Sequence, residues 1–128
     1  MQEPESIVRA FIDDYYRWNN RSYDRFEKDS SPETAASVEA EYEGLLRCFC
    51  RPGFQGKAVA FGLPSTHDPS RETIVECAIG DSRATIKTRN TDVDGFVADY
   101  EFLLVFDHGR WFLEAVDYLD EEGRYAGL

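Results

Sequence analysis

Tyrosines and carboxylates are the side chains of this sequence that could transfer a proton. Tyr15 and Tyr16 are adjacent near the N-terminus, and Asp99 and Asp117 lie in the C-terminal third. A carboxyl group enclosed in an apolar pocket has a raised pKa and can act as a general acid or base. If the protein is an enzyme, these four residues are therefore its catalytic candidates.

A further acidic residue, Glu114, lies three positions before Asp117. Successive side chains of a strand point to opposite faces, so an odd separation places two residues on opposite faces. The sequence therefore predicts that Glu114 and Asp117 do not form a catalytic pair. Ordinary packing of an amphipathic helix would explain Tyr15 and Tyr16 equally well, and Asp99 is also typical of the solvated start of a strand.

His67 is a further candidate base, but residues 66–69 have the sequence Thr-His-Asp-Pro, which is typical of a turn. Ser65 and Ser70 lie nearby without the G-x-S-x-G setting of an activated nucleophile. The sequence contains neither a P-loop nor a dinucleotide-binding fingerprint. We therefore expect no cofactor.

The three cysteines indicate reduced thiols. Cys48, Cys50 and Cys77 are an odd number, so they cannot form a complete set of disulfides. One residue separates Cys48 from Cys50, which is too close for the C-x-x-C spacing of redox and zinc sites. Because His67 and His108 are the only histidines, we also predict no metal site.

The net charge of −11 is concentrated in the C-terminal third. Residues 92–128 contain ten Asp or Glu and two Lys or Arg, a net charge of −8. Nucleic acids and anionic membranes attract proteins of the opposite charge, so we predict direct binding to neither. A basic protein partner would be attracted by this charge. The alternative, which stays open, is that the negative charge serves only to keep the protein soluble.

Neither export nor membrane insertion is predicted. No part of the sequence approaches the roughly 18 consecutive apolar residues of a membrane span. The acidic start, Met-Gln-Glu-Pro-Glu, lacks the basic and apolar regions of a secretory signal. We therefore expect the protein to be cytoplasmic.

The first predicted element is an amphipathic helix that begins near Pro4. It is predicted to end at Asn19-Asn20, with a short extra helical turn over residues 22–28. Its apolar stripe, at three- and four-residue steps, consists of Ile7, Val8, Phe11, Ile12, Tyr15 and Trp18.

A second helix follows, with two alternative starts. Either Ser30 and Glu33 form a capping box, or Ser31 is the N-cap. Residues 51–71 are rich in Pro and Gly and are predicted as a loop that could contain a short strand at 57–61. The buried face of the helix is predicted to consist of Ala35, Val38, Tyr42, Leu45, Leu46 and Phe49.

The apolar period changes to two in the C-terminal half, which predicts antiparallel strands. The tail, residues 120–124, is predicted as a turn. The whole chain, residues 1–128, is therefore predicted as a single α+β domain. The four predicted strands are residues 73–79, 83–89, 96–106 and 111–119.

This order of helices, loop and hairpins resembles the NTF2-like superfamily. Residues 4–12 (PESIVRAFI) resemble its first helix and residues 107–113 (DHGRWFL) resemble its last hairpin. Within the superfamily, the chain is most similar to the NTF2-fold immunity proteins of bacterial polymorphic toxin systems. The residues that carry this similarity are Phe61-Gly62, Thr66-His67-Asp68-Pro69, Ala98-Asp99-Tyr100-Glu101-Phe102, Gly109-Arg110-Trp111-Phe112 and Val116-Asp117-Tyr118.

The resemblance implies both a fold and a function. The fold would be an NTF2-like cone, with N-terminal helices packed on a curved antiparallel sheet of four or more strands. The function would be to bind and neutralise a cognate toxin, such as a nuclease, whose basic surface meets the acidic C-terminal third. Exposed aromatic side chains, with Tyr125 among them, would contribute most of the affinity. The partner-binding candidates are Asp92, Asp94, Asp99, Glu101, Asp117, Tyr118, Asp120, Glu121 and Glu122.

Two other functions remain open. The same superfamily contains isomerases, cyclases and dehydratases, so the chain could be a small-molecule enzyme or a ligand-binding protein. A cavity of several hundred Å³ that holds a desolvated carboxylate would favour this alternative. We expect instead that aromatic side chains fill the cone. The third alternative is a domain that forms homodimers through the outer face of its sheet.

Overall fold

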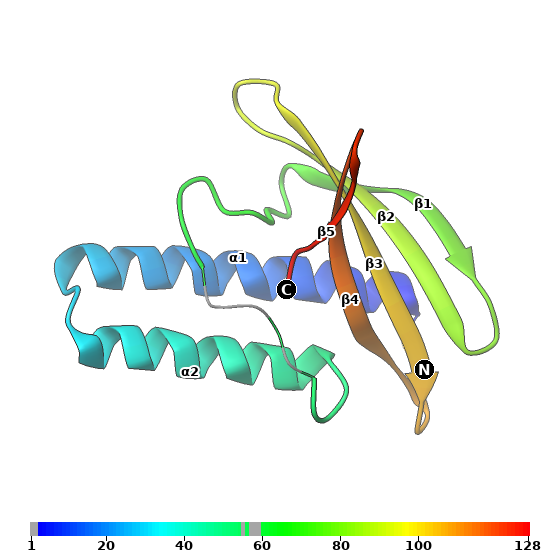
Figure 1. The fold of residues 1–128 in the computed structure, drawn as a ribbon, viewed down its shortest axis with the longest axis horizontal. Helices are drawn as coiled ribbons and strands as arrows, with labels where there is room; N and C mark the ends of the chain where they lie inside the picture. Colours follow the sequence, from blue (N-terminus) through cyan, green and yellow to red (C-terminus); the bar gives the residue numbers. More distant parts are fainter. Residues whose placement is uncertain (1–2, 55, 57–59) are drawn as a thin grey trace.

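The residues that the structure describes form two helices and a five-stranded antiparallel sheet (Figure 1). The computed structural model describes residues 3–54, 56 and 60–128. Each strand pairs with its neighbour in sequence, and the curved sheet crosses α1. This confirms the predicted α+β class and is consistent with an NTF2-like cone. The elements are α1 (Pro4–Lys28), α2 (Pro32–Phe49), β1 (Glu72–Ile79), β2 (Arg83–Thr91), β3 (Val97–Asp107), β4 (Arg110–Asp120) and β5 (Gly123–Ala126).

The first helix is longer than its sequence predicts. Asn19 and Asn20 do not end it, and it continues without interruption to Lys28. The reason is that Asn19 is fully buried and bonds across the fold. Its Nδ2 donates to the Gly62 carbonyl at 2.8 Å, and its Oδ1 accepts from the Gly62 amide at 3.1 Å. Asparagine often ends helices, but at this position Asn19 ties the loop after α2 to α1.

The second helix uses the second of its two predicted starts. Ser31 Oγ accepts a hydrogen bond from the Thr34 amide at 3.3 Å, and Pro32 occupies the first turn. Asp29 supports this cap, since its carboxylate accepts from the Thr34 hydroxyl at 2.8 Å and the Ser31 amide at 3.1 Å. These bonds, with that of Thr34 first, hold the pKa of Asp29 below its ordinary value.

We expect Ser31→Ala to lower the free energy of unfolding by about 1 kcal/mol, because it removes an N-cap acceptor from α2. Urea denaturation would measure the change. Ser30→Ala is the matched control, since Ser30 is an exposed serine one position earlier. It should change the stability by less than about 0.5 kcal/mol. Equal losses in the two variants would contradict the assignment of Ser31 as the cap.

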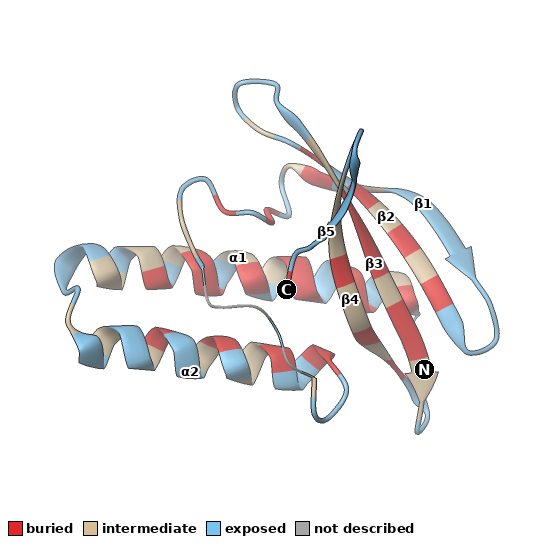
Figure 2. Ribbon diagram, in the orientation of Figure 1, coloured by how far each residue is buried: buried red, intermediate tan, exposed pale blue. Residues whose placement is uncertain are grey.

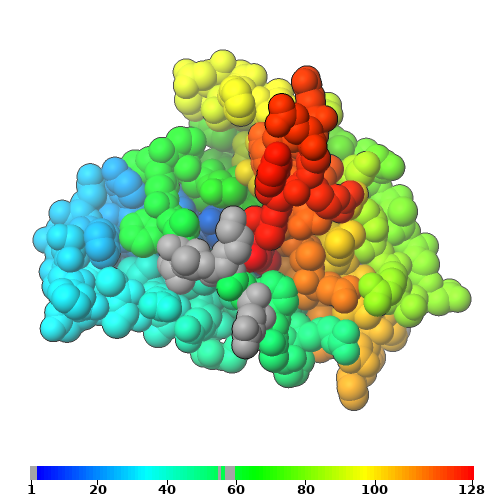
Figure 3. All heavy atoms as spheres, in the orientation of Figure 1, coloured from blue at the N-terminus to red at the C-terminus, as the bar shows by residue number. Residues whose placement is uncertain are grey.

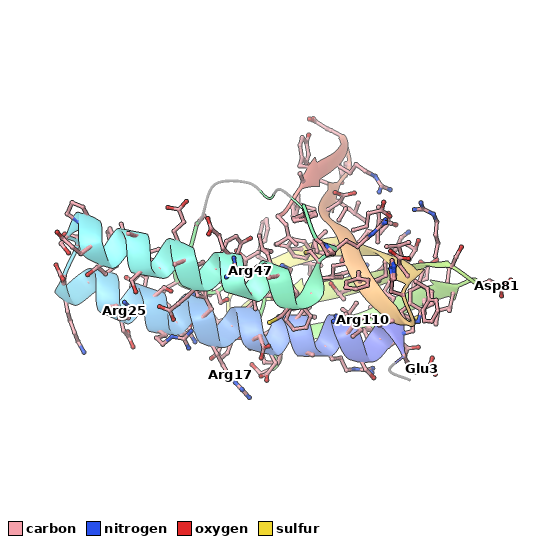
Figure 4. The ribbon with its side chains drawn as sticks, turned by 90° about the horizontal axis from the view of Figure 1, so that it is seen from below. Glu3, Arg17, Arg25, Arg47, Asp81 and Arg110 are labelled. Carbon is pink, nitrogen blue, oxygen red and sulfur yellow. The ribbon has the colours of Figure 1, made fainter. Side chains whose placement is uncertain are left out.

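The two helices lie side by side, as the view from the helix side shows (Figure 4). Trp18 Nε1 of α1 donates to the Val38 carbonyl of α2 at 3.2 Å. Nearer the helix connection, Arg25 donates to Ser37 Oγ at 2.7 Å and also bonds to the carboxylate of Glu41. The hydrogen bonds between the two helices thus include a buried one near their middle and partly exposed ones near the connection. Within the described residues, neither helix has the length and apolarity needed to cross a membrane.

The concave face of the sheet packs on the helices, and the buried residues of both layers face each other (Figure 2). The predicted apolar face of β3 is confirmed, since Tyr100, Phe102 and Leu104 are all buried. Phe11 of α1 meets this face, with its ring centroid 6.0 Å from that of Phe102. The core thus forms where the helical stripe and the inward phase of the strands coincide.

The C-terminal tail contains a strand that the sequence analysis missed. Residues 120–124 were predicted as a turn, but only the start of this segment turns. From Gly123 the chain pairs with β4 as β5, with Tyr125 opposite Tyr118. The Gly127 amide then donates to the Val116 carbonyl at 2.6 Å, and Leu128 is buried. Of the strand predicted at residues 57–61, residues 57–59 lie outside the described residues, and the other two are not in a strand.

Candidate functional site

A pocket of about 360 Å³ lies between the concave face of the sheet, the two helices and the C-terminal segment. In the space-filling view, the C-terminal segment (red) lies between the loop after α2 (green) and β4 (orange) (Figure 3). Side chains fill the core between the sheet and the helices, and the pocket lies beside the C-terminal segment. We call this cavity the tyrosine pocket, because five tyrosines line it together with Thr66: Tyr15, Tyr42, Tyr100, Tyr118 and Tyr125.

The strand register brings three of these tyrosines into one row. Tyr100 on β3 is opposite Tyr118 on β4, which in turn is opposite Tyr125 on β5. The rings of Tyr100 and Tyr118 are 5.6 Å apart between centroids, with a 65° angle between their planes. The rings of Tyr15 on α1 and Tyr42 on α2 are 6.5 Å apart between centroids, with a 79° angle between their planes. The aromatic rings that line the pocket are therefore steeply inclined to each other within each pair.

Burial keeps the phenol groups of the tyrosine pocket neutral. It raises the pKa of Tyr100 to about 12, with a smaller contribution from the nearby charge of Glu72. Burial also raises the pKa of Tyr42 and of Tyr15, although a hydrogen bond with the Thr66 side chain lowers the latter in part. At neutral pH these three side chains offer hydroxyl groups and ring faces rather than charge.

Directly behind the pocket lies a buried histidine–glutamate pair. His67 Nδ1 is 2.9 Å from Glu72 Oε1, and the side chains are only 1% and 0% exposed. The other carboxylate oxygen, Glu72 Oε2, accepts a hydrogen bond from the Thr88 hydroxyl at 2.5 Å. The His67 ring packs against Tyr15 and Tyr100 of the pocket, with centroid distances of 5.0 and 4.8 Å. The Glu72 carboxylate thus bonds to two buried side chains, one of which, His67, is packed among aromatic rings.

The sequence of residues 66–69 predicts a turn and gives no indication of this pair. The segment is indeed a turn, since Asp68 Oδ1 accepts from the Ser70 amide at 2.9 Å. However, its histidine points inward, and the signal for this lies in β2. Thr88 and Asn90 are in the same strand phase as the buried Ile86, and polar residues at inward positions need buried partners. Asn90 finds one in the Thr66 carbonyl, at 3.1 Å.

The four catalytic candidates do not come together. Tyr15 lines the tyrosine pocket, but Tyr16, Asp99 and Asp117 are not among its lining residues. Asp99 lies on the outer face of the sheet, where Arg89 binds its carboxylate through two hydrogen bonds of 2.8 and 3.2 Å. The hydrogen bonds with Arg89 hold the pKa of Asp99 below its ordinary value. Such a carboxylate stays ionised and paired, which makes it a poor general base.

Asp117 is also engaged on the outer face. It lies opposite Glu101 in the register, and Arg124 of β5 binds both carboxylates. Arg124 Nη1 is 2.6 Å from Glu101 Oε1 and 3.2 Å from Asp117 Oδ2. Three of the predicted partner-binding acids, Asp99, Glu101 and Asp117, therefore have arginine partners within the chain.

A β-bulge corrects the predicted faces of β4. Leu103 pairs with Ala115, but Leu104 pairs with Leu113, so the register skips Glu114. The bulge shifts the alternation by one residue. Glu114 therefore lies on the same outer face as Asp117, and the prediction that they occupy opposite faces is wrong. They still do not form a pair, because Glu114 bonds instead to Arg83, at 2.8 Å.

The remaining acidic candidates gather at one end of the sheet. The β2–β3 loop and the β4–β5 turn are far apart in sequence, but both lie at this end (Figure 1). Between them, residues 92–96 and 120–122 contain five carboxylates and no Lys or Arg. We call this surface the acidic rim, and its acidic residues are Asp92, Asp94, Asp120, Glu121 and Glu122.

Exposed apolar side chains accompany the acidic rim. Val93 is 72% exposed, Phe96 is 67% exposed, and Tyr125 of β5 is 50% exposed. The loops that present them are ordered by their own acids. Asp92 Oδ1 accepts from the amides of Asp94 and Phe96, both at 2.9 Å, and Asp120 likewise accepts from the backbone of its own turn. The rim thus combines a fixed backbone with exposed charge and exposed apolar surface.

Neither a metal cluster nor a known relative identifies the site. Among the described residues, no group of three or more His, Cys, Asp or Glu side chains could hold a metal ion. All three cysteines are free, and burial raises the pKa of Cys50 to about 12. Comparison of the chain with family models, curated proteins and solved structures finds no match.

Proposed function

We propose that the protein is an immunity protein that binds a cognate bacterial toxin through the acidic rim and neutralises it. The observation that carries this proposal is the convergence of five carboxylates with exposed Val93, Phe96 and Tyr125 at one end of the sheet. Acidic side chains steer a basic partner, and apolar and aromatic side chains inside the same field supply most of the affinity. The resemblance to NTF2-fold immunity proteins supports the same function.

Internal pairing narrows the predicted binding surface. Asp99, Glu101 and Asp117 are each bound by an arginine of this chain, so a partner would have to compete with Arg89 or Arg124. Tyr118 lines the tyrosine pocket rather than the outer surface. The rim residues Asp94, Glu121 and Glu122 are exposed and are therefore the charges that we assign to the interface.

Co-expression with a candidate toxin from the neighbouring gene tests the function. The protein should restore growth and form a complex that elutes together on a sizing column. Toxicity that persists without complex formation would overturn the proposal. A basic toxin surface also implies that raising the salt concentration slows association.

Two kinds of variant test the surface. Phe96→Ala should weaken binding about tenfold or more, mainly by faster dissociation, because it removes an exposed aromatic anchor. The double variant Asp94→Lys with Glu121→Lys should slow association about tenfold at low salt. Surface plasmon resonance would separate the two rates.

Asp81→Lys is the matched control for the charge reversals. Asp81 is exposed and lies in the β1–β2 turn, at the opposite end of β2 from the rim loop. It changes the net charge in the same direction without touching the acidic rim. If Asp81→Lys slowed association as much per charge as the rim variants, the rim would not be the interface.

A second candidate function follows from the tyrosine pocket. Its volume falls within the range of about 300–1,000 Å³ that is typical of small-molecule sites. The lining residues that the structure describes include no carboxylate and no histidine, so the pocket favours ligand binding over proton transfer. Tyr125 belongs both to the pocket lining and to the exposed apolar side chains beside the acidic rim, so the two surfaces adjoin there, whereas the carboxylates of the rim lie outside the pocket.

A further inference from the structure

The tyrosine pocket has a lining whose chemistry restricts the ligand. Among the described residues that line it, none is a lysine, arginine or histidine. An anion would lose its hydration on entering and would find no positive charge to replace it. The pocket therefore selects against phosphates and carboxylates.

Its aromatic walls are suited to a cation. A guanidinium or alkylammonium group is attracted to the negative face of a tyrosine ring when it lies within about 6 Å of the centroid. The ring planes of Tyr15 and Tyr42 are inclined at 79° to each other, and those of Tyr100 and Tyr118 at 65°. Walls that meet at such angles can surround one compact group on several sides.

The buried pair behind the pocket adds to this preference. The Glu72 carboxylate bonds to His67, whose ring packs on Tyr15 and Tyr100 of the pocket wall at centroid distances of 5.0 and 4.8 Å. The charge of Glu72 reaches the pocket wall, because it contributes to the raised pKa of Tyr100. The overall charge of −11 acts in the same direction.

We propose that the tyrosine pocket binds the head group of an organic cation, a guanidinium or a substituted ammonium. A volume of about 360 Å³ suits such a head group rather than a large ligand. The cation could belong to an arginine or lysine side chain of a protein partner or to a free small molecule. The inference does not depend on toxin binding, since it concerns the concave pocket and not the acidic rim.

Titration calorimetry on the isolated protein tests it with a pair of matched probes. N-acetyl-arginine methylamide carries the guanidinium, and N-acetyl-citrulline methylamide is its neutral isostere. We expect the arginine probe to bind about tenfold more tightly than the citrulline probe. Equal affinities for the arginine and citrulline probes would overturn the proposal. It would also be overturned if neither the arginine probe nor tetramethylammonium bound.

Tetramethylammonium distinguishes the two sources of the cation. It has no peptide backbone, so its binding would show that the head group alone is sufficient and that a free small molecule can be the ligand. Binding of the arginine probe without tetramethylammonium would support a side chain of a protein partner. Both results support a cation site, and toxin is absent from each titration, so failure here leaves the immunity proposal unaffected.

Variants of Tyr118 test the aromatic wall. Tyr118→Phe keeps the aromatic ring, so its affinity for the arginine probe should be within about twofold of the parent affinity. Tyr118→Leu removes the ring and should bind the probe at least about fivefold more weakly, on the order of one lost cation–π contact. Tyr23→Leu is the control, since Tyr23 lies on α1 and is not a lining residue. If Tyr118→Leu fails to fold, Tyr125→Leu replaces it at a half-exposed position. Unchanged affinity in the leucine variant would overturn the proposal.

Discussion

Glu72→Ala is expected to lower the free energy of unfolding by about 3–5 kcal/mol, because it leaves His67 and Thr88 buried without their shared partner. Glu72 is fully buried and bonds to His67 Nδ1 at 2.9 Å and to the Thr88 hydroxyl at 2.5 Å. Through this carboxylate, the loop after α2 is attached to β1 and β2. Urea denaturation followed by tryptophan fluorescence would measure the loss.

Glu76→Ala is the matched control on the same strand. Its side chain is 65% exposed, and its Oε2 lies 3.7 Å from Lys87 Nζ. Its removal should therefore lower the free energy of unfolding by less than about 1 kcal/mol. Glu72→Gln should be intermediate, because the amide oxygen can still accept from Thr88 while the charge is lost. If Glu72→Ala were no more destabilising than Glu76→Ala, the buried pair would not hold the loop.

Periodicity in the sequence was sufficient to predict the layers of the fold. The stripe from Ile7 to Trp18 forms the buried face of α1, and the even-numbered residues of β3 face the core. Both patterns are local, so they depend only on backbone geometry. The end of α1 was predicted less well, because the bond between Asn19 and Gly62 joins residues that are 43 positions apart.

The site was harder to predict, because it depends on pairing between distant segments. Three tyrosines of the pocket align only after β5 is added to the sheet, and residues 123–126 alone contain little apolar pattern. The bulge at Glu114 likewise has no signal in strict alternation. The net charge indicated that the C-terminal third is acidic, but it did not indicate which carboxylates are free to bind a partner. Arginines from β2 and β5 pair with Asp99, Glu101 and Asp117.

Trp18→Ala should both destabilise the fold and impair the tyrosine pocket. Trp18 is 2% exposed, and its ring lies 5.5 Å from that of Tyr15 and 4.7 Å from that of Tyr42. Truncating a buried tryptophan costs about 3–5 kcal/mol, through the lost contacts and the cavity that remains. Because Tyr15 and Tyr42 both rest on this ring, we also expect affinity for the arginine probe to fall. Denaturation and calorimetry on one protein preparation would give both values.

Trp111→Ala separates these two effects. Trp111 is also buried and packs on Phe106 at a centroid distance of 5.3 Å, at the end of β4 away from Tyr118. It should cost a similar amount of stability, on the order of 3–5 kcal/mol, and leave probe binding unchanged in the folded protein. Trp18→Phe should lose about 1 kcal/mol from the missing hydrogen bond of Trp18 Nε1 to the Val38 carbonyl, while the aromatic contact with Tyr42 remains. Equal loss of probe binding in the Trp18→Ala and Trp111→Ala variants would mean that the pocket responds to overall stability rather than to support from Trp18.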